Sequence, residues 1–217
     1  MNKIISHENL LEFYSHGLFP MADSKSSEIV NLYQPKKRFL IPINKFHVSK
    51  KLFKLFKKNT YTFKINNNFE SVISKCQLAN RKDHGTWINE IILHSYINLH
   101  KQKMCHSVEC YDKNKLVGGL YGVHIGGGFF GESMFSDLTN TSKFCLLYLI
   151  AILKKNLFLL LDSQFYNEHL LQFGAYEISN EDYLKKLKTN LKYLRKFIFV
   201  DDFHEVLSLL QPNNHKS

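Results

Sequence analysis

Two carboxylates lie in apolar surroundings where an unpaired acid is unfavourable. Glu132 lies within the strand-like run Gly-Glu-Ser-Met-Phe-Ser, and Asp162 follows three consecutive leucines. A carboxylate is costly to bury unless it is paired or hydrogen-bonded, and glutamate is depleted from strands. Two such acids in one cleft could remove a proton from an incoming group. The alternative for Asp162 is an aspartate that only ends a strand and caps the next turn.

Gln164 lies two residues beyond Asp162, so in an extended chain the two side chains share a face. We expect the Gln164 amide NH2 to donate a hydrogen bond to Asp162, which would turn the amide oxygen outward. That oxygen could accept a hydrogen bond from an amine. The arrangement suits amide-bond formation, in which an amine loses a proton while it attacks an acyl carbon.

The order of the expected elements predicts that the two acids meet. A period of two predicts antiparallel strands at 107–111, 116–124 and 128–135, and a helix at 142–155 then leads to a buried strand at 158–162. If the strands at 128–135 and 158–162 are parallel neighbours, both end at one edge, where ligands bind. These patterns predict an α+β fold with a mixed sheet.

The remaining pattern predicts a strand at 61–65 and irregular chain at 21–37. Asn140 or Thr141 is expected to cap helix 142–155, and Asn156 to end it in a left-handed conformation. Further helices are expected at 8–18, at 50–58 after Ser49, from Asn68 or Ser71 to about 79, at 88–101, at 167–173 and at 181–196, the last with Leu184, Leu187, Leu191 and Leu194 on its apolar stripe.

The chain is basic, because 29 lysines and arginines outnumber 19 acidic residues and give a formal charge of +10. Such a charge indicates a polyanionic partner, first of all RNA or DNA. Lysine is abundant throughout, so the charge could also serve only to solvate surfaces. The clearest cluster lies on the expected helix 50–58 and consists of Lys50, Lys51, Lys54, Lys57 and Lys58.

Several functional classes are excluded by the sequence. No apolar run reaches the roughly 18 residues of a membrane span, and no Walker A, Gly-x-Ser-x-Gly or HExxH motif occurs. Glycines 126–128 lie between strands and indicate a β-turn. Cys105 and Cys110 would point to opposite faces of a strand, so we expect no metal site. Four scattered cysteines indicate packed thiols in a reducing compartment, the cytoplasm.

Many short blocks between about residues 12 and 187 resemble the leucyl/phenylalanyl-tRNA–protein transferase family, in order and at family spacing. These blocks are Gly85-Thr-Trp-Ile88, Leu99-His100, His106-Ser-Val-Glu109, Leu116-Val-Gly-Gly-Leu-Tyr-Gly-Val123, Gly131-Glu-Ser-Met-Phe-Ser136, Ser142-Lys143, Asp162-Ser-Gln164, Asn167-x-His169-Leu170 and Gly174-Ala175.

The resemblance implies an enzyme that moves Leu or Phe, and Met less well, from aminoacyl-tRNA to the N-terminal Arg or Lys of proteins. The product is marked for N-end-rule degradation. The implied fold is a catalytic domain of acetyltransferase-like (GNAT-like) topology at 37–217, with a small N-terminal domain at 1–36 packed on it. No metal or cofactor is implied, and we expect a monomer without a membrane partner.

The resemblance also implies roles for individual residues. Asp162 and Gln164 would be the catalytic pair, and Glu132 the cleft acid near the basic acceptor terminus or the 3′ adenosine. The lysines of helix 50–58 would hold the tRNA acceptor stem through its phosphates. The pocket for the transferred side chain would consist of Leu120, Phe129, Met134, Leu149, Leu153 and Leu161.

Two features of the chain depart from the family pattern. Trp87 and Tyr96 would contact the terminal adenosine or the ester, but Met21 stands where the family usually has a tryptophan that could stack there. Leu149 and Leu153 occupy positions that are often Phe, so we expect a roomier pocket. The alternatives are a related N-acyltransferase that uses aminoacyl-tRNA or acyl-CoA on a small-molecule or cell-wall amine, and a non-enzymatic RNA-binding module.

Overall fold

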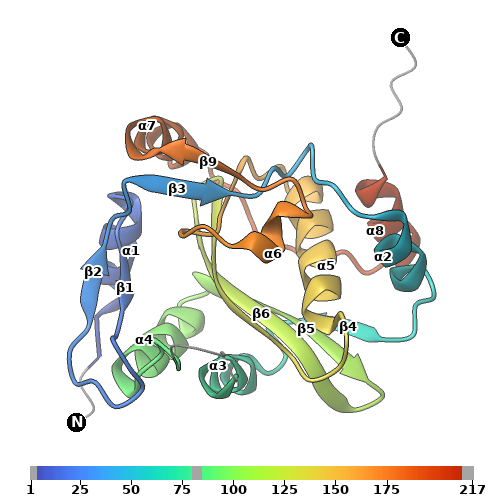
Figure 1. The fold of residues 1–217 in the computed structure, drawn as a ribbon, viewed down its shortest axis with the longest axis horizontal. Helices are drawn as coiled ribbons and strands as arrows, with labels where there is room; N and C mark the ends of the chain where they lie inside the picture. The colour runs from blue at the N-terminus through green and yellow to red at the C-terminus, as the bar shows by residue number, and fades with distance from the viewer. Residues whose placement is uncertain (1–3, 80–84, 212–217) are drawn as a thin grey trace.

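In the computed structural model, which describes residues 4–79 and 85–211, a seven-stranded mixed sheet lies between two groups of helices (Figure 1). The strand order is β4-β5-β6-β7-β8-β3-β9. The predicted α+β class with a mixed sheet is confirmed. The strands of this sheet are β3 (Lys37–Leu40), β4 (Thr62–Ile65), β5 (Cys105–Asp112), β6 (Lys115–Ile125), β7 (Gly128–Ser136), β8 (Leu160–Asp162) and β9 (Tyr176–Ser179).

The centre of the sheet follows the predicted topology. Strands β5, β6 and β7 form an antiparallel meander, and β7 pairs in parallel with β8. The last paired positions of the parallel strands are Phe130 and Asp162. Because β8 ends at Asp162 while β7 continues to Ser136, the two strands separate beyond this pair. The edge that was predicted to bind a ligand is therefore open.

Helices cover both faces of the sheet, and each face has its own apolar core. Helices α3 (Phe69–Leu78) and α4 (Glu90–Lys101) pack on one face, and α5 (Thr141–Lys155) packs on the other beside α8 (Phe203–Leu210). Cys105 belongs to the first core and Cys110 to the second, as their opposite directions predict. All four cysteines are buried free thiols. None of the helices in the described part of the chain combines the length and apolarity that a membrane crossing requires.

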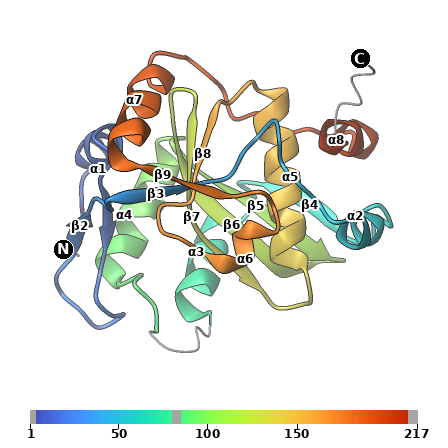
Figure 2. The ribbon, with the colours of Figure 1, turned by 45° about the horizontal axis from the view of Figure 1, so that its top comes forward.

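The first part of the chain packs against the core that contains α3 and α4. Helix α1 (His7–Ser15) begins after the cap Ser6 and ends before Gly17, whose φ is +77°. Buried Leu10, Tyr14 and Phe19 join this core. The chain then enters the large sheet at β3, between β8 and β9 (Figure 2). The division into domains at 1–36 and 37–217 stays a prediction.

Several local expectations are wrong. The segment 21–37 is not irregular, because β1 (Phe19–Met21) pairs with β2 (Asn31–Tyr33) and β3 follows. Strand β9 and helix α8 were not predicted. Helix α7 (Asn180–Asn190) ends early because the carbonyl of Asn190 accepts a hydrogen bond from Gly127 (2.8 Å), and Leu194 is 97% exposed.

The ends of α5 also differ from the expectation. Asn140 precedes the helix in a left-handed conformation, and its side chain makes no capping bond. The Thr141 hydroxyl instead donates to the carbonyl of Val117 (2.8 Å), which fixes the start of α5 to the sheet. At the other end, Leu157 and not Asn156 has a positive φ.

Candidate active site

A cavity of about 440 Å³ opens where β7 and β8 separate. Glu132 and Asp162 both lie in its wall, so the two acids meet at one hollow as the strand order predicted. The middle of α5 and the short helix α6 (Glu168–Leu171) close its apolar side. The residues that line it are Ile41, Trp87, Leu120, Tyr121, Gly131, Glu132, Ser133, Met134, Leu146, Leu149, Leu161, Asp162, Ser163, Asn167 and Leu170.

Glu132 lies on a β-bulge of β7. Tyr121 of β6 pairs with Ser133, and the next residue, Gly122, pairs with Gly131, so Glu132 is the extra residue between them. A bulge interrupts the alternation of side chains and re-aims one of them. This irregularity explains how a glutamate in an apolar strand reaches the cavity.

Three hydrogen-bond donors hold the Glu132 carboxylate. The Tyr14 hydroxyl and the Gln164 amide nitrogen each donate to Oε1 at 2.6 Å, and the Tyr96 hydroxyl donates to Oε2 at 3.2 Å. The hydroxyls of Tyr14 and Tyr96 also contact each other. The donors come from α1, α4 and the chain after β8, so the carboxylate is fixed by three separate parts of the fold.

Burial raises the pKa of Glu132 to about 7, the nearby charge of Asp162 adds to the rise, and the three hydrogen bonds oppose it. The pKa values of Tyr14 and Tyr96 are raised well above the ordinary value, first by burial and then by the charge of Glu132, so both remain protonated donors. A carboxylate with a pKa near 7 is divided between its two protonation states at neutral pH. Glu132 is therefore suited to take up and release a proton.

The Asp162 carboxylate is engaged in a buried ion pair that the sequence did not predict. Arg38 Nε lies 3.0 and 2.9 Å from the two oxygens, and Arg38 Nη2 lies 2.7 Å from Oδ2. The Tyr183 hydroxyl donates to Oδ2 at 2.7 Å, and the backbone N–H of Gln164 donates to Oδ1 at 2.8 Å. The side chains of Arg38 and Asp162 are both fully buried. These donors occupy both oxygens of the Asp162 carboxylate.

Arg38 connects several elements besides the strand that carries Asp162. Its guanidinium lies over the rings of Phe19 and Tyr183, 4.8 and 4.4 Å from their centroids, and Nη1 donates to the carbonyl of Gly17 at 2.8 Å. The sequence contains one signal of this buried charge. Arg38 directly precedes the apolar run Phe39-Leu40-Ile41.

The expected bond from the Gln164 amide to the Asp162 side chain is wrong. Gln164 has a left-handed backbone with φ +67°, so the chain is not extended there and its side chain turns toward Glu132. Instead, the backbone N–H of Gln164 donates to Asp162 Oδ1. Gln164 is 6% exposed. Its side-chain amide orients the Glu132 carboxylate, and Gln164 itself is not among the residues that line the cavity. A non-glycine residue in this conformation is strained and is typical of functional sites.

The structure brings together four of the six residues that were expected to form the side-chain pocket. Leu120, Met134, Leu149 and Leu161 line the cavity; Phe129 and Leu153 do not. Leu153 lies one helical turn beyond Leu149 toward the end of α5, whereas the cavity is lined by Leu146 and Leu149 in the middle of this helix. Phe129 packs instead against Phe197, with ring centroids 5.3 Å apart. Sequence reasoning missed three apolar residues of the wall, Ile41, Leu146 and Leu170.

The three residues expected near the adenosine lie in different places. Trp87 lines the cavity just before α4. Tyr96 is fully buried and donates to Glu132, which lies in the cavity wall. Met21 lies in β1 and packs against the core that contains α3 and α4.

The predicted basic helix is present as α2 (Lys50–Phe56), and the Ser49 hydroxyl caps it at Leu52 N (3.2 Å). Leu52 and Phe56 are buried, and Figure 1 shows α2 beside α8. The lysines are all exposed and present an unpaired cationic surface among the described residues; they are Lys50, Lys51, Lys54, Lys57 and Lys58.

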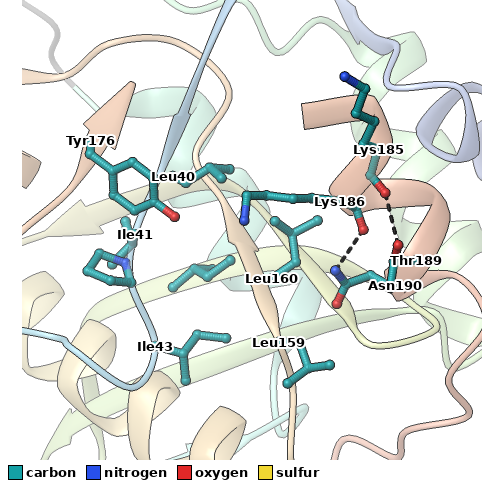
Figure 3. Close-up of a pocket in the computed structure, with 12 residues that line it drawn as sticks. Leu40, Ile41, Ile43, Leu159, Leu160, Tyr176, Lys185, Lys186, Thr189 and Asn190 are labelled. Atoms are coloured by element: carbon teal, nitrogen blue, oxygen red, sulfur yellow. Dashed lines mark hydrogen bonds between the residues drawn. The ribbon is translucent and has the colours of Figure 1, made fainter. Parts of the chain in front are cut away.

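A second hollow of about 410 Å³ lies at the other end of β8 and shares Ile41 and Leu161 with the cavity. Figure 3 shows the Lys186 ammonium extending toward Tyr176 and Leu160, whereas Lys185 points away. No carboxylate is among the described residues that line this hollow. The cavity with Glu132 has two carboxylates in its wall, so it is the candidate active site.

Comparison with known proteins identifies relatives of the whole region that carries this site. The family model described as leucyl/phenylalanyl-tRNA protein transferase matches residues 40–188. The chain is 44% identical over 189 residues to such a transferase of Zymomonas mobilis subsp. mobilis. This alignment covers 87% of the present chain and 70% of the relative. It is 43% identical to that of Maricaulis maris, which covers 90% of each.

Among solved structures, L-PGS from Bacillus licheniformis aligns with 95% of this chain and 63% of its own, at 12% identity and a TM-score of 0.40. The sequence relationships are much closer than this one. The matched family region includes both Glu132 and Asp162, and Arg38 lies just outside it. The match covers most of the chain, at 43–44% sequence identity to the two relatives. The chain belongs to the leucyl/phenylalanyl-tRNA–protein transferase family.

Proposed function

We propose that the protein transfers leucine or phenylalanine, and methionine less well, from aminoacyl-tRNA to the N-terminal arginine or lysine of acceptor proteins. In the cytoplasm this would mark the acceptors for N-end-rule degradation. The observation that carries the proposal is an apolar cavity with a glutamate in its wall, in a chain of this family. The buried free thiols support a reducing compartment.

The apolar wall fits the side chain that is transferred. Burying a leucine or phenylalanine side chain contributes about 1.5–3 kcal/mol, which is enough to favour these residues over polar ones. The leucines in the wall, where a phenylalanine would take more space, leave room for either side chain. The apolar side chains of the wall are Ile41, Leu120, Met134, Leu146, Leu149, Leu161 and Leu170.

The reaction joins the acceptor amine to the acyl carbon of the aminoacyl ester. The C–N bond forms and the bond from the acyl carbon to the ribose oxygen breaks. As the amide forms, the amine nitrogen gives up a second proton, which passes to the ribose oxygen, so the tRNA leaves with a free hydroxyl. The acceptor enters as an ammonium and must lose a proton before it attacks. Glu132 accepts this proton, and its negative charge also attracts the basic acceptor terminus.

The pKa of Glu132 fits this task. An α-amino group has a pKa of about 7.7–8.0, so transfer of its proton to a carboxylate of pKa about 7 is uphill by only about 1 kcal/mol. A carboxyl with the ordinary value of 4.5 would make the same step uphill by about 4–5 kcal/mol. The buried position of Glu132 therefore lowers the barrier to amine activation.

Asp162 and Gln164 act as positioning residues in this scheme. Asp162 pairs with Arg38 and holds the backbone of Gln164, and Gln164 in turn orients Glu132. The chain of contacts runs from Arg38 to the carboxylate that meets the substrate. Replacing Asp162 or Gln164 by alanine would thus slow transfer without weakening the binding of tRNA.

The remaining parts of the proposal concern the fold and the tRNA. The antiparallel β5-β6-β7 meander and the separation of parallel β7 and β8 support a GNAT-like topology for residues 37–217. The lysines of α2 contact phosphates of the acceptor stem, and Trp87 lies against the terminal adenosine. The protein acts as a monomer and needs no cofactor.

The test mixes purified protein with labelled Leu-tRNA and a peptide that begins with arginine. The matched control is the same peptide with an acetylated N-terminus, which has no amine to accept the leucine. Transfer to the first peptide alone supports the proposal. Transfer only to a non-protein amine would favour the related N-acyltransferase, and tRNA binding without any transfer would favour an RNA-binding module.

A further inference from the structure

A third cavity lies at the end of the β5–β6 hairpin that is remote from its turn. We call it the histidine cavity, and its volume is about 650 Å³. Strand β5 begins here and β6 ends here, while the segment after α7 crosses over the opening. The residues that line it are Asn66, His100, Lys101, Lys103, His106, His124, Arg195, Lys196, Phe197 and Ile198.

The wall of the histidine cavity is strongly cationic. Its four permanently charged residues are Lys101, Lys103, Arg195 and Lys196, and no aspartate or glutamate is among the described residues that line it. None of the four forms an ion pair with a described residue. Four positive side chains around one hollow repel each other, so this arrangement favours an anion.

Buried nitrogen atoms without well-placed partners lie in the same wall. Among the described residues, His106 Nε2, His124 Nδ1 and Arg195 Nε are buried and have no hydrogen bond of good geometry; for the two histidines, weaker backbone contacts to Lys103, Gly126 and Arg195 are the nearest partners. Asn66 accepts from Ser107 N through Oδ1, so its Nδ2 donates to His106 Nδ1 (3.0 Å). The remaining hydrogen of His106 is therefore on Nε2. His106 Nε2 and Arg195 Nε are thus buried donors without a well-placed acceptor, which is unfavourable and rare, and they point to a missing oxygen-rich group.

The histidine cavity is also held in place by ring stacking. The ring of His106 stacks on Phe197 with centroids 4.4 Å apart at 11°, and Phe197 stacks in turn on Phe129 at 5.3 Å. His100 Nδ1 contacts the carbonyl of Cys105 at 2.8 Å. These contacts fix the segment that carries Arg195 and Lys196 over the two histidines. The cations are thus arranged around a prepared site.

We propose that the histidine cavity binds a phosphate group, and that its source is a backbone phosphate of the tRNA. A phosphate offers the negative charge and the several acceptor oxygens that the wall lacks. Helix α4 connects the two sites, since Trp87 precedes its start and Lys101 is its last residue, and its 12 residues span about 18 Å. A polynucleotide can reach both sites, whereas one mononucleotide cannot. The tRNA source rests on the proposed function; the phosphate site does not.

The experiment compares two triple variants of the full-length protein. The first, Lys101→Gln, Lys103→Gln and Lys196→Gln, removes three charges from the histidine cavity. The control, Lys25→Gln, Lys113→Gln and Lys115→Gln, removes three exposed charges elsewhere, two of them at the opposite end of the β5–β6 hairpin. Dissociation constants for uncharged tRNA are measured at several salt concentrations. Imidazole NMR signals of His106 and His124 are followed during titration with inorganic phosphate.

The expected result has two parts. The cavity variant binds tRNA at least tenfold more weakly than the control variant, with a salt dependence reduced by about 1–3 counterions. Inorganic phosphate shifts both histidine signals in the wild type and in the control variant, but not in the cavity variant. Equal tRNA affinities of the two variants would overturn tRNA as the source. Absence of a phosphate response in the wild type would overturn the site.

Failure of this inference is distinct from failure of the proposed function. The control variant alters no residue of the histidine cavity or of the candidate active site, so it is expected to retain the wild-type rate of leucine transfer. If the wild type transfers leucine while the two variants bind tRNA equally, only the tRNA assignment of the histidine cavity is wrong. If the wild type transfers no leucine, the proposed function is wrong, and the phosphate titration still tests the site.

Discussion

Arg38 contacts both carboxylate oxygens of Asp162, and neither side chain is exposed to solvent. The adjacent residue Lys37 makes a contrasting pair with Glu177, at 3.4 Å on the surface. Removing one partner of a buried ion pair leaves an uncompensated charge, which costs about 3–5 kcal/mol, whereas an exposed pair is worth about 0–1 kcal/mol. Two neighbouring residues of β3 thus provide a matched comparison.

We expect Arg38→Met to lower the free energy of unfolding by about 3–5 kcal/mol and Lys37→Met to change it by less than about 1 kcal/mol. Urea unfolding measures both. Arg38→Met combined with Asp162→Leu removes both charges and is expected to recover part of the stability, but not the transfer activity, since Gln164 loses its anchor. Equal costs for the two single variants would contradict the buried ion pair.

The rate of transfer should depend on pH through Glu132. As a base Glu132 must be ionised, and its pKa is about 7, so the single-turnover rate is expected to rise between about pH 6 and 8 and then level off. Glu132→Gln is expected to reduce the rate by about 10²–10⁴-fold and to leave only the limb of the acceptor amine itself, at about pH 7.7–8.0. The measurement uses quenched-flow transfer from Leu-tRNA at saturating peptide. A wild-type limb near the ordinary carboxyl value of 4.5 would count against Glu132 as the base.

Glu132 should also make the stability of the protein depend on pH. Its pKa is raised in the folded state, from 4.5 to about 7, so the folded protein binds the proton more tightly than the unfolded chain. This contribution to stability is present at low pH and is lost as the pH rises from about 4.5 to 7, by about 3 kcal/mol. Glu132→Gln should lack this pH dependence. Urea unfolding of both proteins at pH 5 and pH 8 gives the difference.

Leu170 and Leu171 test the specificity of the cavity. Leu170 lies in its wall, whereas Leu171 is 45% exposed on the same short helix. Leu170→Ala enlarges the cavity and is expected to reduce kcat/KM for Leu-tRNA relative to Phe-tRNA by about 10-fold, the effect of small changes in an apolar pocket. Leu171→Ala should leave the ratio unchanged. A ratio that responds equally to both substitutions would show that the side chain binds elsewhere.

The lysines of α2 are expected to affect binding and not chemistry. Replacing Lys50, Lys51 and Lys54 by glutamine should weaken tRNA binding and reduce its salt dependence by about one counterion for each phosphate that a lysine no longer neutralises. The single-turnover rate at saturating tRNA should be unchanged. The matched control replaces Lys185, Lys188 and Lys192, which lie on or just after α7. A rate that falls in proportion to affinity would contradict this separation of roles.

The sequence was sufficient to predict the parts of the site that depend on strand order. Hydrophobic runs of period two and the buried strand before Asp162 placed the two acids at one edge, and the structure confirms it. Family resemblance added the positions of Leu120, Met134, Leu149 and Leu161. These are properties of local pattern and of chain order, which a single sequence contains.

The hydrogen-bond partners could not be predicted, because they depend on contacts between distant segments. Arg38 reaches Asp162 across 124 positions of the chain, and Tyr14 reaches Glu132 across 118. Gln164 was misplaced because its left-handed backbone follows from the bond between its N–H and Asp162, which no spacing rule contains. The β-bulge at Glu132 could not be predicted either, because the sequence pattern of alternating residues assumes a regular strand.

The contact between Arg38 and the carbonyl of Gly17 has a consequence for the dynamics of the protein. It joins the chain just after α1 to β3, whose Arg38 also holds Asp162 at the end of β8, while Tyr14 on α1 holds Glu132. Undocking of α1 would therefore break both carboxylate networks in one event. Amide hydrogens in α1 and β8 should exchange with deuterium as a single cooperative unit, and a substrate that rigidifies one should slow exchange in the other.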